Sequence, residues 1–219
     1  MTDTHYTPEL LRDGPDDADY VFVFAHGAGQ GMDAPFMDDI AEGVAQAGFQ
    51  ALRFEFPYMA TARAQGKRKP PDRMPKLLSA WSDVVVLVEN EGWRRKQIVI
   101  GGKSMGGRMA SMIADEQEVA GLICLGYPFH PPGKPDNPRV AHLEELTTPA
   151  LICQGERDTF GTQEDVKGYS LSHQIELCWL NDGDHGFKPR KKSGLTLEDN
   201  IATAVAAMVD FMQRRLPPP

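Results

Sequence analysis

Residues 98–110 read IVIGGKSMGGRMA, and this stretch decides the fold. It opens with aliphatic, mostly β-branched residues, which are typical of a buried strand. The apolar residues over 109–113 then recur at the spacing of a helix face. Between strand and helix stands the pattern G-x-S-x-G, with Ser104 between Gly102 and Gly106. A sharp turn there lifts a hydroxyl clear of the sheet, and glycines permit the close backbone approach that such a turn needs. The stretch therefore predicts a nucleophilic serine.

Segments of the same kind recur along the chain and alternate with helical patterns. Their near-continuous hydrophobicity favours strands covered on both faces, as in a parallel sheet. A capping box, Thr196 to Asp199, precedes the last helical pattern, and Asp33 can cap the first. The predicted strands are 20–25, 50–56, 97–101, 121–125, 150–154 and 175–180, and the predicted helical stripes lie within 36–47, 77–88, 109–113 and 201–212.

This alternation predicts an α/β fold with a mostly parallel sheet of six to seven strands and helices on both faces. We expect one domain over residues 1–219, with 1–15 and 217–219 peripheral. Two stretches, 62–75 and 127–139, read as loops. In such a sheet, ligands bind beyond the carboxyl ends of the strands.

Composition excludes several classes of protein. Hydrophobic residues make up 41% and charged residues 25%, as in ordinary globular domains, and the net charge of -8 argues against a nucleic-acid partner. No basic stretch followed by an apolar one opens the chain, and no apolar run could cross a bilayer, so we expect a cytoplasmic protein without a membrane partner. The three cysteines, Cys124, Cys153 and Cys178, lack metal-site spacing and lie in predicted strands, so we expect buried thiols.

A serine hydroxyl needs a neighbouring base, and the base needs an acid that fixes its tautomer. Where the serine stands on a strand–turn–helix with the G-x-S-x-G pattern, the three residues follow in the order serine, acid, histidine. The loop after the fifth predicted strand offers Asp158, with Glu156 as the alternative, and the loop after the sixth offers His185. Carboxylates beside that histidine could suggest a metal, but no second histidine stands at ligand spacing, so neither metal nor organic cofactor is expected.

The segment after the first predicted strand supplies the remaining part. Negative charge on a substrate carbonyl oxygen is stabilised by aimed backbone N–H groups. The expected donors of this oxyanion hole are the amides of Ala28 and Met105, with Gly29 as an alternative to Ala28. His26 is interpreted as a structural hydrogen-bonding residue.

Six motifs together resemble a known family. They are HGAGQGMDAPFM (26–37), RFEFPYM (53–59), GGKSMGGRMAS (101–111), GYPFHPPGKP (126–135), QGERDTFG (154–161) and GDHGFKPRKKSG (183–194). The chain resembles alpha/beta-hydrolase proteins related to testis-expressed protein 30 and to the hydrolase-like subunit of the non-specific-lethal chromatin complex, from about His26 to about Gly194. The resemblance implies the alpha/beta-hydrolase fold and places Ser104, Asp158 and His185 on the family's triad positions. It supplies no substrate, and the chromatin subunit resembles a scaffold.

We therefore expect a serine hydrolase that cleaves small acyl esters or thioesters. The alternatives are a catalytically silent interaction protein and, less favoured, a peptidase. Residues 126–149 are too few for the helical cap of many lipases, which predicts an open site.

Ten of the 23 basic residues lie in two loops expected on the active-site face, where they could steer anionic substrates or only be solvated. Lys103 is expected to pack or pair locally. The candidate substrate contacts are Gly29, Tyr58, Phe129, Phe160, Arg63 and Lys188, the aromatic ones with core packing as the alternative. The oligomeric state is left open.

Overall fold

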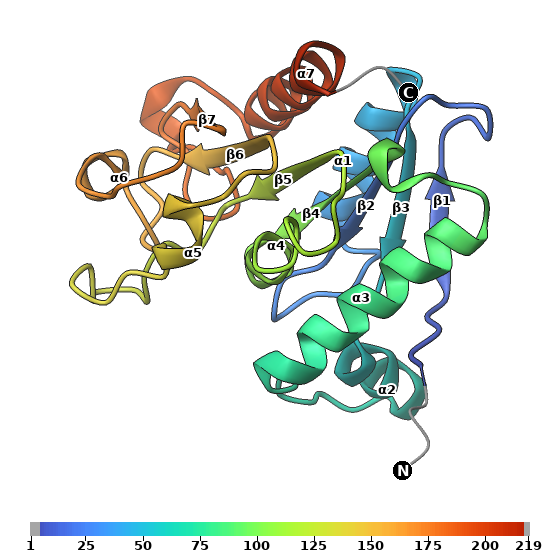
Figure 1. Ribbon diagram of the computed structural model, residues 1–219. Helices are drawn as coiled ribbons and strands as arrows, with labels where there is room; N and C mark the ends of the chain where they lie inside the picture. The colour runs from blue at the N-terminus through green and yellow to red at the C-terminus, as the bar shows by residue number, and fades with distance from the viewer. Residues whose placement is uncertain (1–4, 217–219) are drawn as a thin grey trace.

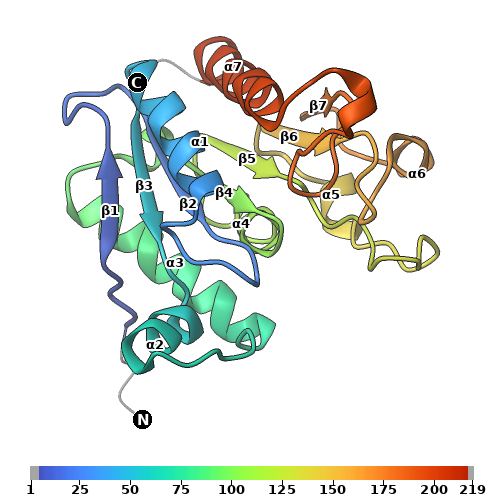
Figure 2. The same cartoon turned by 180° about the vertical axis from the view of Figure 1, so that it is seen from behind.

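The computed structural model describes residues 5–216. They form a single seven-stranded sheet with helices packed against it (Figure 1). The strand order is β1-β3-β2-β4-β5-β6-β7. All neighbouring strands are parallel except β1 and β3, whose arrows run in opposite directions in Figure 2. The predicted mostly parallel sheet is confirmed. The strands are β1 (Leu10–Asp13), β2 (Val21–Ala25), β3 (Gln50–Phe54), β4 (Ile98–Lys103), β5 (Gly121–Leu125), β6 (Ala150–Gly155) and β7 (Ile175–Leu180).

Helices cover both faces of this sheet. In Figure 1, α3 and α4 lie in front of the strands, and Figure 2 shows α1 and α7 on the opposite face. The helices are α1 (Pro35–Gln46), α2 (Pro57–Gln65), α3 (Met74–Asn90), α4 (Met105–Ser111), α5 (Ala141–Glu144), α6 (Gln163–Lys167) and α7 (Leu197–Arg215), with 3-10 turns η1 (Arg95–Gln97) and η2 (Lys191–Ser193).

The core forms two layers because successive side chains of a strand point to opposite faces. On β2, Val21 and Val23 belong to the layer under α3 and α4, whereas Phe22 and Phe24 belong to the layer under α1 and α7. The rings of these two phenylalanines stack with centroids 4.6 Å apart. All residues of β2 are buried, so the central strand is covered on both sides.

Three details differ from the sequence-based expectations. Residues 1–15 are not all peripheral, because β1 adds an antiparallel strand to the edge of the sheet. The stretch 62–75 is not all loop, since α2 extends to Gln65 and α3 begins at Met74. The first helix is preceded by Ala34 with Pro35 in its first turn, and Asp33 makes no cap. Residues 217–219, expected to be peripheral, lie outside the described residues.

A buried arginine explains why the acidic N-terminal segment forms a strand. Arg53 on β3 is 5% exposed, and its guanidinium pairs with Asp13 of β1 at 2.8 Å and with Asp38 of α1. The same guanidinium donates to the Met32 carbonyl at 3.1 Å. A buried guanidinium needs such partners, and they hold β1 and the start of α1 to the sheet. Charge composition alone gave no sign of this pairing.

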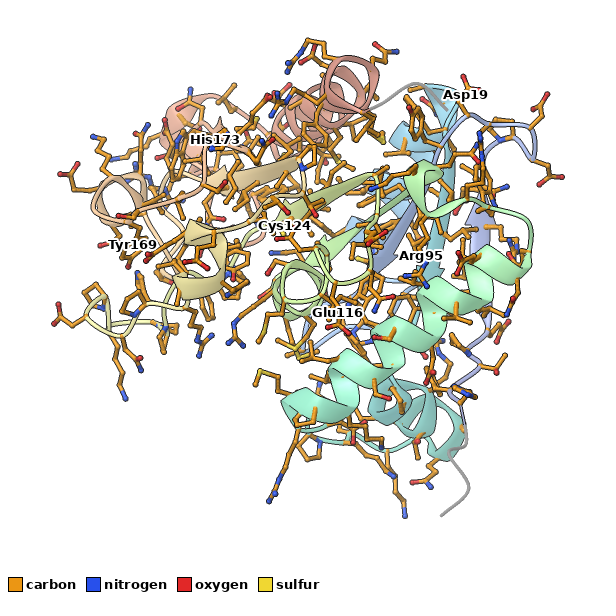
Figure 3. All side chains as sticks on the ribbon, in the orientation of Figure 1. Asp19, Arg95, Glu116, Cys124, Tyr169 and His173 are labelled. Carbon is orange, nitrogen blue, oxygen red and sulfur yellow. The ribbon has the colours of Figure 1, made fainter. Side chains whose placement is uncertain are left out.

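The other predictions about segments agree with the structure. The capping box at Thr196 and Asp199 opens α7. Between β5 and β6 the chain forms only the short helix α5, so no helical cap covers this edge. Cys124 lies in the middle of the molecule (Figure 3), and all three cysteines are free thiols. Cys124 and Cys153 are buried as expected, whereas Cys178 is partly exposed, which corrects the expectation for this residue. No helix within residues 5–216 is long and apolar enough to span a membrane.

We predict that Val84 contributes strongly to stability and that its neighbour Val86 does not. Both lie on α3, but Val84 is fully buried against the sheet and Val86 is 43% exposed. Val84→Ala should lower the free energy of unfolding by about 2 kcal/mol, because it removes buried methyl groups and leaves a cavity. Val86→Ala should change it by less than about 0.5 kcal/mol. Urea denaturation of both variants measures the difference, and equal losses would contradict the packing of α3 described above.

Candidate active site

The turn between β4 and α4 holds Ser104 in a backbone conformation that residues other than glycine seldom adopt. Its backbone has φ 50° and ψ −111°. Gly102 has φ +144°, and a Cβ there would lie 2.2 Å from the carbonyl oxygen of Ala25 on β2. A Cβ on Gly106 would lie 2.4 Å from the same oxygen. Glycine is therefore required on both sides of the serine, since any side chain would collide with β2.

Three loops at the carboxyl edge of the sheet join in one hydrogen-bonded chain. The Ser104 hydroxyl lies 2.9 Å from His185 Nε2, and His185 Nδ1 lies 2.8 Å from Asp158 Oδ2. The serine follows β4, the aspartate follows β6 and the histidine follows β7. Residues separated by 81 and 27 positions in the sequence thus form one proton path.

The partners fix the proton positions of the neutral imidazole. A carboxylate only accepts, so Nδ1 carries the proton and donates it to Asp158. Nε2 is then free to accept the Ser104 hydroxyl proton. The Phe160 ring packs against the imidazole, with centroids 4.4 Å apart. This arrangement keeps the imidazole pointed at the hydroxyl.

Asp158 is fully buried, and hydrogen-bond donors contact both of its carboxylate oxygens. Oδ2 accepts from His185 and from Gln154 Nε2 at 2.9 Å, and Oδ1 accepts from the Phe160 amide at 2.8 Å. Gln154 itself is fully buried on β6 and also bonds both backbone groups of Tyr127. Gln154 was not predicted as a site residue. The sequence signal that could have identified it is a single polar amide side chain near the end of an otherwise apolar strand.

The acidic alternatives to Asp158 have other partners. Glu156 Oε2 accepts from the Asp182 amide at 2.8 Å, which directs this carboxylate toward the β7 loop. Asp182 in turn pairs with Arg157 and Arg190. The geometry therefore selects Asp158 over Glu156 as the partner of the imidazole. Within residues 5–216, no group of three His, Cys, Asp or Glu side chains could hold a metal ion.

The predicted oxyanion segment is held by side chains behind it. The Phe56 amide donates to His26 Nε2 at 3.1 Å, so Nδ1 carries the proton and donates to the Gly27 carbonyl at 2.6 Å. Tyr58 donates its hydroxyl to the Ala28 carbonyl at 3.1 Å. No hydrogen bond within residues 5–216 uses the amides of Ala28 or Met105. Both predicted donors are thus left without a protein acceptor.

The predicted aromatic contacts divide into two groups. Phe129 is fully buried and packs on Tyr127 and Tyr169, so its assignment as a substrate contact is wrong. Tyr58 is 3% exposed and supports the Ala28 loop from behind, which corrects the same assignment. Phe160 stays partly exposed beside His185. The two buried rings belong to the core, as the alternative interpretation expected, because the hydrophobic effect favours the burial of large apolar side chains.

Two open pockets surround the site. The first, here called the Gly29 pocket, has a volume of about 470 Å³, and Ala28, Gly29 and Arg63 line it. The charge of Arg63 is neutralised, because Glu55 and Asp33 bond its guanidinium and raise the pKa of Arg63. The second, the His185 pocket, has a volume of about 610 Å³, and its walls include Lys103, Phe36, Arg157, Asp184, His185 and Lys188.

A second serine–histidine pair lies outside these pockets. Ser111 Oγ is 2.8 Å from His142 Nε2, but the serine is buried within α4 and donates to the Arg108 carbonyl. Burial and the nearby Arg108 lower the pKa of His142. Tyr127 is the other neighbour of this ring, and no carboxylate among the described residues bonds it. The pair lacks the acid and the exposed hydroxyl that nucleophilic catalysis requires.

Comparison with known proteins identifies the family of this chain. The family model described as alpha/beta hydrolase domain matches residues 18–213, so the chain belongs to the alpha/beta hydrolase family.

Solved structures share the fold at low sequence identity. A lidless serine hydrolase from Xanthomonas campestris is 18% identical, with TM-score 0.69 over 97% of this chain and 91% of that one. Est1E from Butyrivibrio proteoclasticus is 16% identical, with TM-score 0.68 over 94% of each chain. A dienelactone hydrolase from Anabaena variabilis is 18% identical, with TM-score 0.71 over 96% of this chain and 93% of that one. Such likeness shows the fold and leaves the substrate open.

We predict that buried His26 makes stability depend on pH. Burial lowers the pKa of His26 below its ordinary value of 6.5. The unfolded chain therefore binds more protons below pH 6.5, and the free energy of unfolding should fall as the pH drops from about 6.5 to 5. His26→Gln should make this slope shallower, and His142→Gln gives the comparison for a partly buried histidine whose pKa burial also lowers. Urea denaturation at each pH measures the slopes, and an unchanged slope in His26→Gln would exclude this role.

Proposed function

We propose that the protein is a serine hydrolase that cleaves small acyl esters or thioesters through an acyl-enzyme. The observation that carries the proposal is the hydrogen-bonded chain from Ser104 through His185 to Asp158, at 2.9 and 2.8 Å. These distances are those at which a base takes a hydroxyl proton. Membership of the alpha/beta hydrolase family and the likeness to esterase structures support the same reaction class.

In the proposed mechanism, Ser104 Oγ attacks the substrate carbonyl while its proton moves to His185 Nε2. The amides of Ala28 and Met105 stabilise the negative oxygen. The tetrahedral intermediate collapses, the bond to the leaving group breaks, and the imidazolium gives the proton to that group. Water then repeats the sequence on the acyl-enzyme and releases the acid. Asp158 stabilises the imidazolium in both halves, and no step requires a metal or an organic cofactor.

The open edge favours small or surface-presented substrates over buried lipid chains. Lys67, Arg68 and Lys69 are exposed along the Gly29 pocket, and Lys188 is exposed at the other pocket. These cations support a preference for anionic substrates. Arg63 adds little to it, since two carboxylates neutralise its charge.

The narrower resemblance to testis-expressed protein 30 and the non-specific-lethal subunit is part of this proposal, as is a cytoplasmic location. A catalytically silent interaction protein is the alternative that the scaffold-like relative suggests. Intact serine, histidine, acid and amide positions favour turnover. Peptidase activity is less favoured, because the segment between β5 and β6 lacks the helical cap that many peptidases of this fold carry there.

We predict that a fluorophosphonate probe labels the wild type covalently and does not label Ser104→Ala. The probe reports the activated hydroxyl itself, so the natural substrate need not be known. Ser111→Ala is the matched control, since it removes the hydroxyl of the other serine–histidine pair and should retain labelling. Mass spectrometry locates the adduct. A folded wild type without an adduct would favour the interaction protein. An adduct on Ser111 would show that Ser111, and not Ser104, is the nucleophile.

We also predict that Asp158 and Glu156 differ sharply in their effect on activity. Asp158→Asn should lower kcat for a nitrophenyl acyl ester about 1000- to 10,000-fold, because the amide no longer holds the productive imidazole tautomer. Glu156→Gln should stay within about threefold of the wild type, since its retained oxygen can still accept the Asp182 amide. Steady-state kinetics measure both effects. A larger loss in Glu156→Gln would exchange the two assignments.

A further inference from the structure

Lys103 carries a charged group that the proposed catalytic steps do not use. It ends β4, directly before Ser104, and its ammonium lies among protein atoms although the residue as a whole is partly exposed. The ammonium donates to the backbone carbonyl of His185. It also lies 5.4 Å from the ring centroid of Phe36 and 5.5 Å from that of Phe187. This charge is thus held beside the catalytic histidine by neutral groups.

The Lys103 ammonium lacks the partner that buried charges usually have. Among residues 5–216, no carboxylate oxygen lies within ion-pair distance of it, whereas Arg53 and Arg63 each have two acidic partners. An ammonium has three N–H donors, and in the described part of the chain a single acceptor, the His185 carbonyl, bonds this one. Aromatic faces attract a cation weakly and do not satisfy N–H donors. The group is therefore poised to bind an anion.

The His185 pocket gives such an anion a place to bind. Its volume is about 610 Å³, and Lys103, Arg157 and Lys188 line it together with a single carboxylate, Asp184. That carboxylate is occupied, since its Oδ1 accepts the amides at positions 186 and 188. Arg157 is shared with Asp182, and Lys188 is exposed. Positive charge exceeds negative charge along the wall.

Position relative to the histidine indicates which half of a substrate enters this pocket. The imidazole gives its proton to the leaving group, so the leaving group must lie next to His185. The acyl oxygen would bind at the amides of Ala28 and Met105, which do not line the His185 pocket. A group that fills the His185 pocket therefore belongs to the alcohol or thiol half.

We propose that the His185 pocket binds a carboxylate on the leaving-group half of the substrate, with the Lys103 ammonium as its ion-pair partner. This inference rests on the proposed hydrolase function and names the class of substrate. The exposed loop lysines would steer any anion, whereas Lys103 selects one location on the ligand. The residue before the nucleophile thereby becomes a specificity determinant.

The pKa of Lys103 supports a test by pH. Burial lowers it to about 8, against the opposing effect of Asp158 and Asp184. Above that pH the ammonium loses its proton and its attraction for an anion. His185, Arg157 and Lys188 share the pocket, so a Lys103 variant is needed to assign a pH effect to the Lys103 ammonium.

The experiment compares the acetyl esters of 3-hydroxybenzoate and 3-hydroxybenzamide, which differ in leaving-group charge at nearly equal size. For the wild type at pH 7 we expect kcat/KM to favour the carboxylate ester by about 10-fold, and Lys103→Met should bring the ratio near one. The ratio cancels any general loss of activity, because damage to the histidine loop affects both esters. Lys96→Met, exposed before the other end of β4, is the matched control and should keep the wild-type ratio.

Two further measurements can be made on the wild type itself. The wild-type ratio should fall as the pH rises through about 8, and where Lys103→Met folds it should show no such step. The preference should persist at about 1 M salt, where exposed charges are screened within about 3 Å. A preference that vanishes in salt, or a ratio unchanged in Lys103→Met, would overturn the inference and assign selectivity to the exposed loops.

A binding measurement separates this inference from the proposed function. Calorimetry should detect 3-hydroxybenzoate binding to Ser104→Ala and about 10-fold weaker binding to Ser104→Ala with Lys103→Met. Binding lost with Lys103 would support the pocket even if neither ester were hydrolysed. Hydrolysis of both esters at equal rates, with no binding of 3-hydroxybenzoate, would refute the pocket and leave the hydrolase proposal standing.

Discussion

The rest of the site depends on the close approach of the β4–α4 turn to β2. The backbone at Gly102 and Gly106 comes so near the Ala25 carbonyl that only hydrogen fits in place of a side chain. This approach forces Ser104 to a positive φ and turns its hydroxyl outward. Such backbone strain persists only where the surroundings over-determine the conformation. Here the parallel pairing of β4 with β2 and β5 supplies that support.

Buried polar side chains that bond Asp158 and the Ala28 segment hold the loops around this turn. Gln154 orients Asp158 while bonding both backbone groups of Tyr127, so one amide connects the loops after β5 and β6. His26 and Tyr58 fix the segment that bears the Ala28 amide. Each of these groups is satisfied by hydrogen bonds, as buried polar atoms must be. Their role is geometric, because their hydrogen bonds hold Asp158 and the Ala28 segment in place.

Charge around the site divides into compensated and uncompensated groups. The guanidinium of Arg63 is held between two carboxylates, and that of Arg190 is paired with Asp182. These arginines order loops and contribute little net field. Lys103 lacks such a partner, and the exposed lysines of the Gly29 pocket are surrounded by water. Counting basic residues therefore overstates the field at Ser104, and it overlooks the buried ammonium beside it.

The sequence by itself determined the six parallel strands β2 to β7, the serine on its turn and the order in which the candidate acid and histidine follow it, because hydrophobic period and glycine spacing are local properties of the chain. It left Asp158 and Glu156 as alternatives, since both carboxylates lie in one loop. Only the tertiary structure chose between them, by directing Glu156 to the Asp182 amide. Burial of Phe129, the partnership of Arg53 with β1 and the isolation of the Lys103 ammonium likewise depend on distant segments. Contacts between distant segments produce no repeating pattern in the sequence, because they form only when the folded chain brings those segments together.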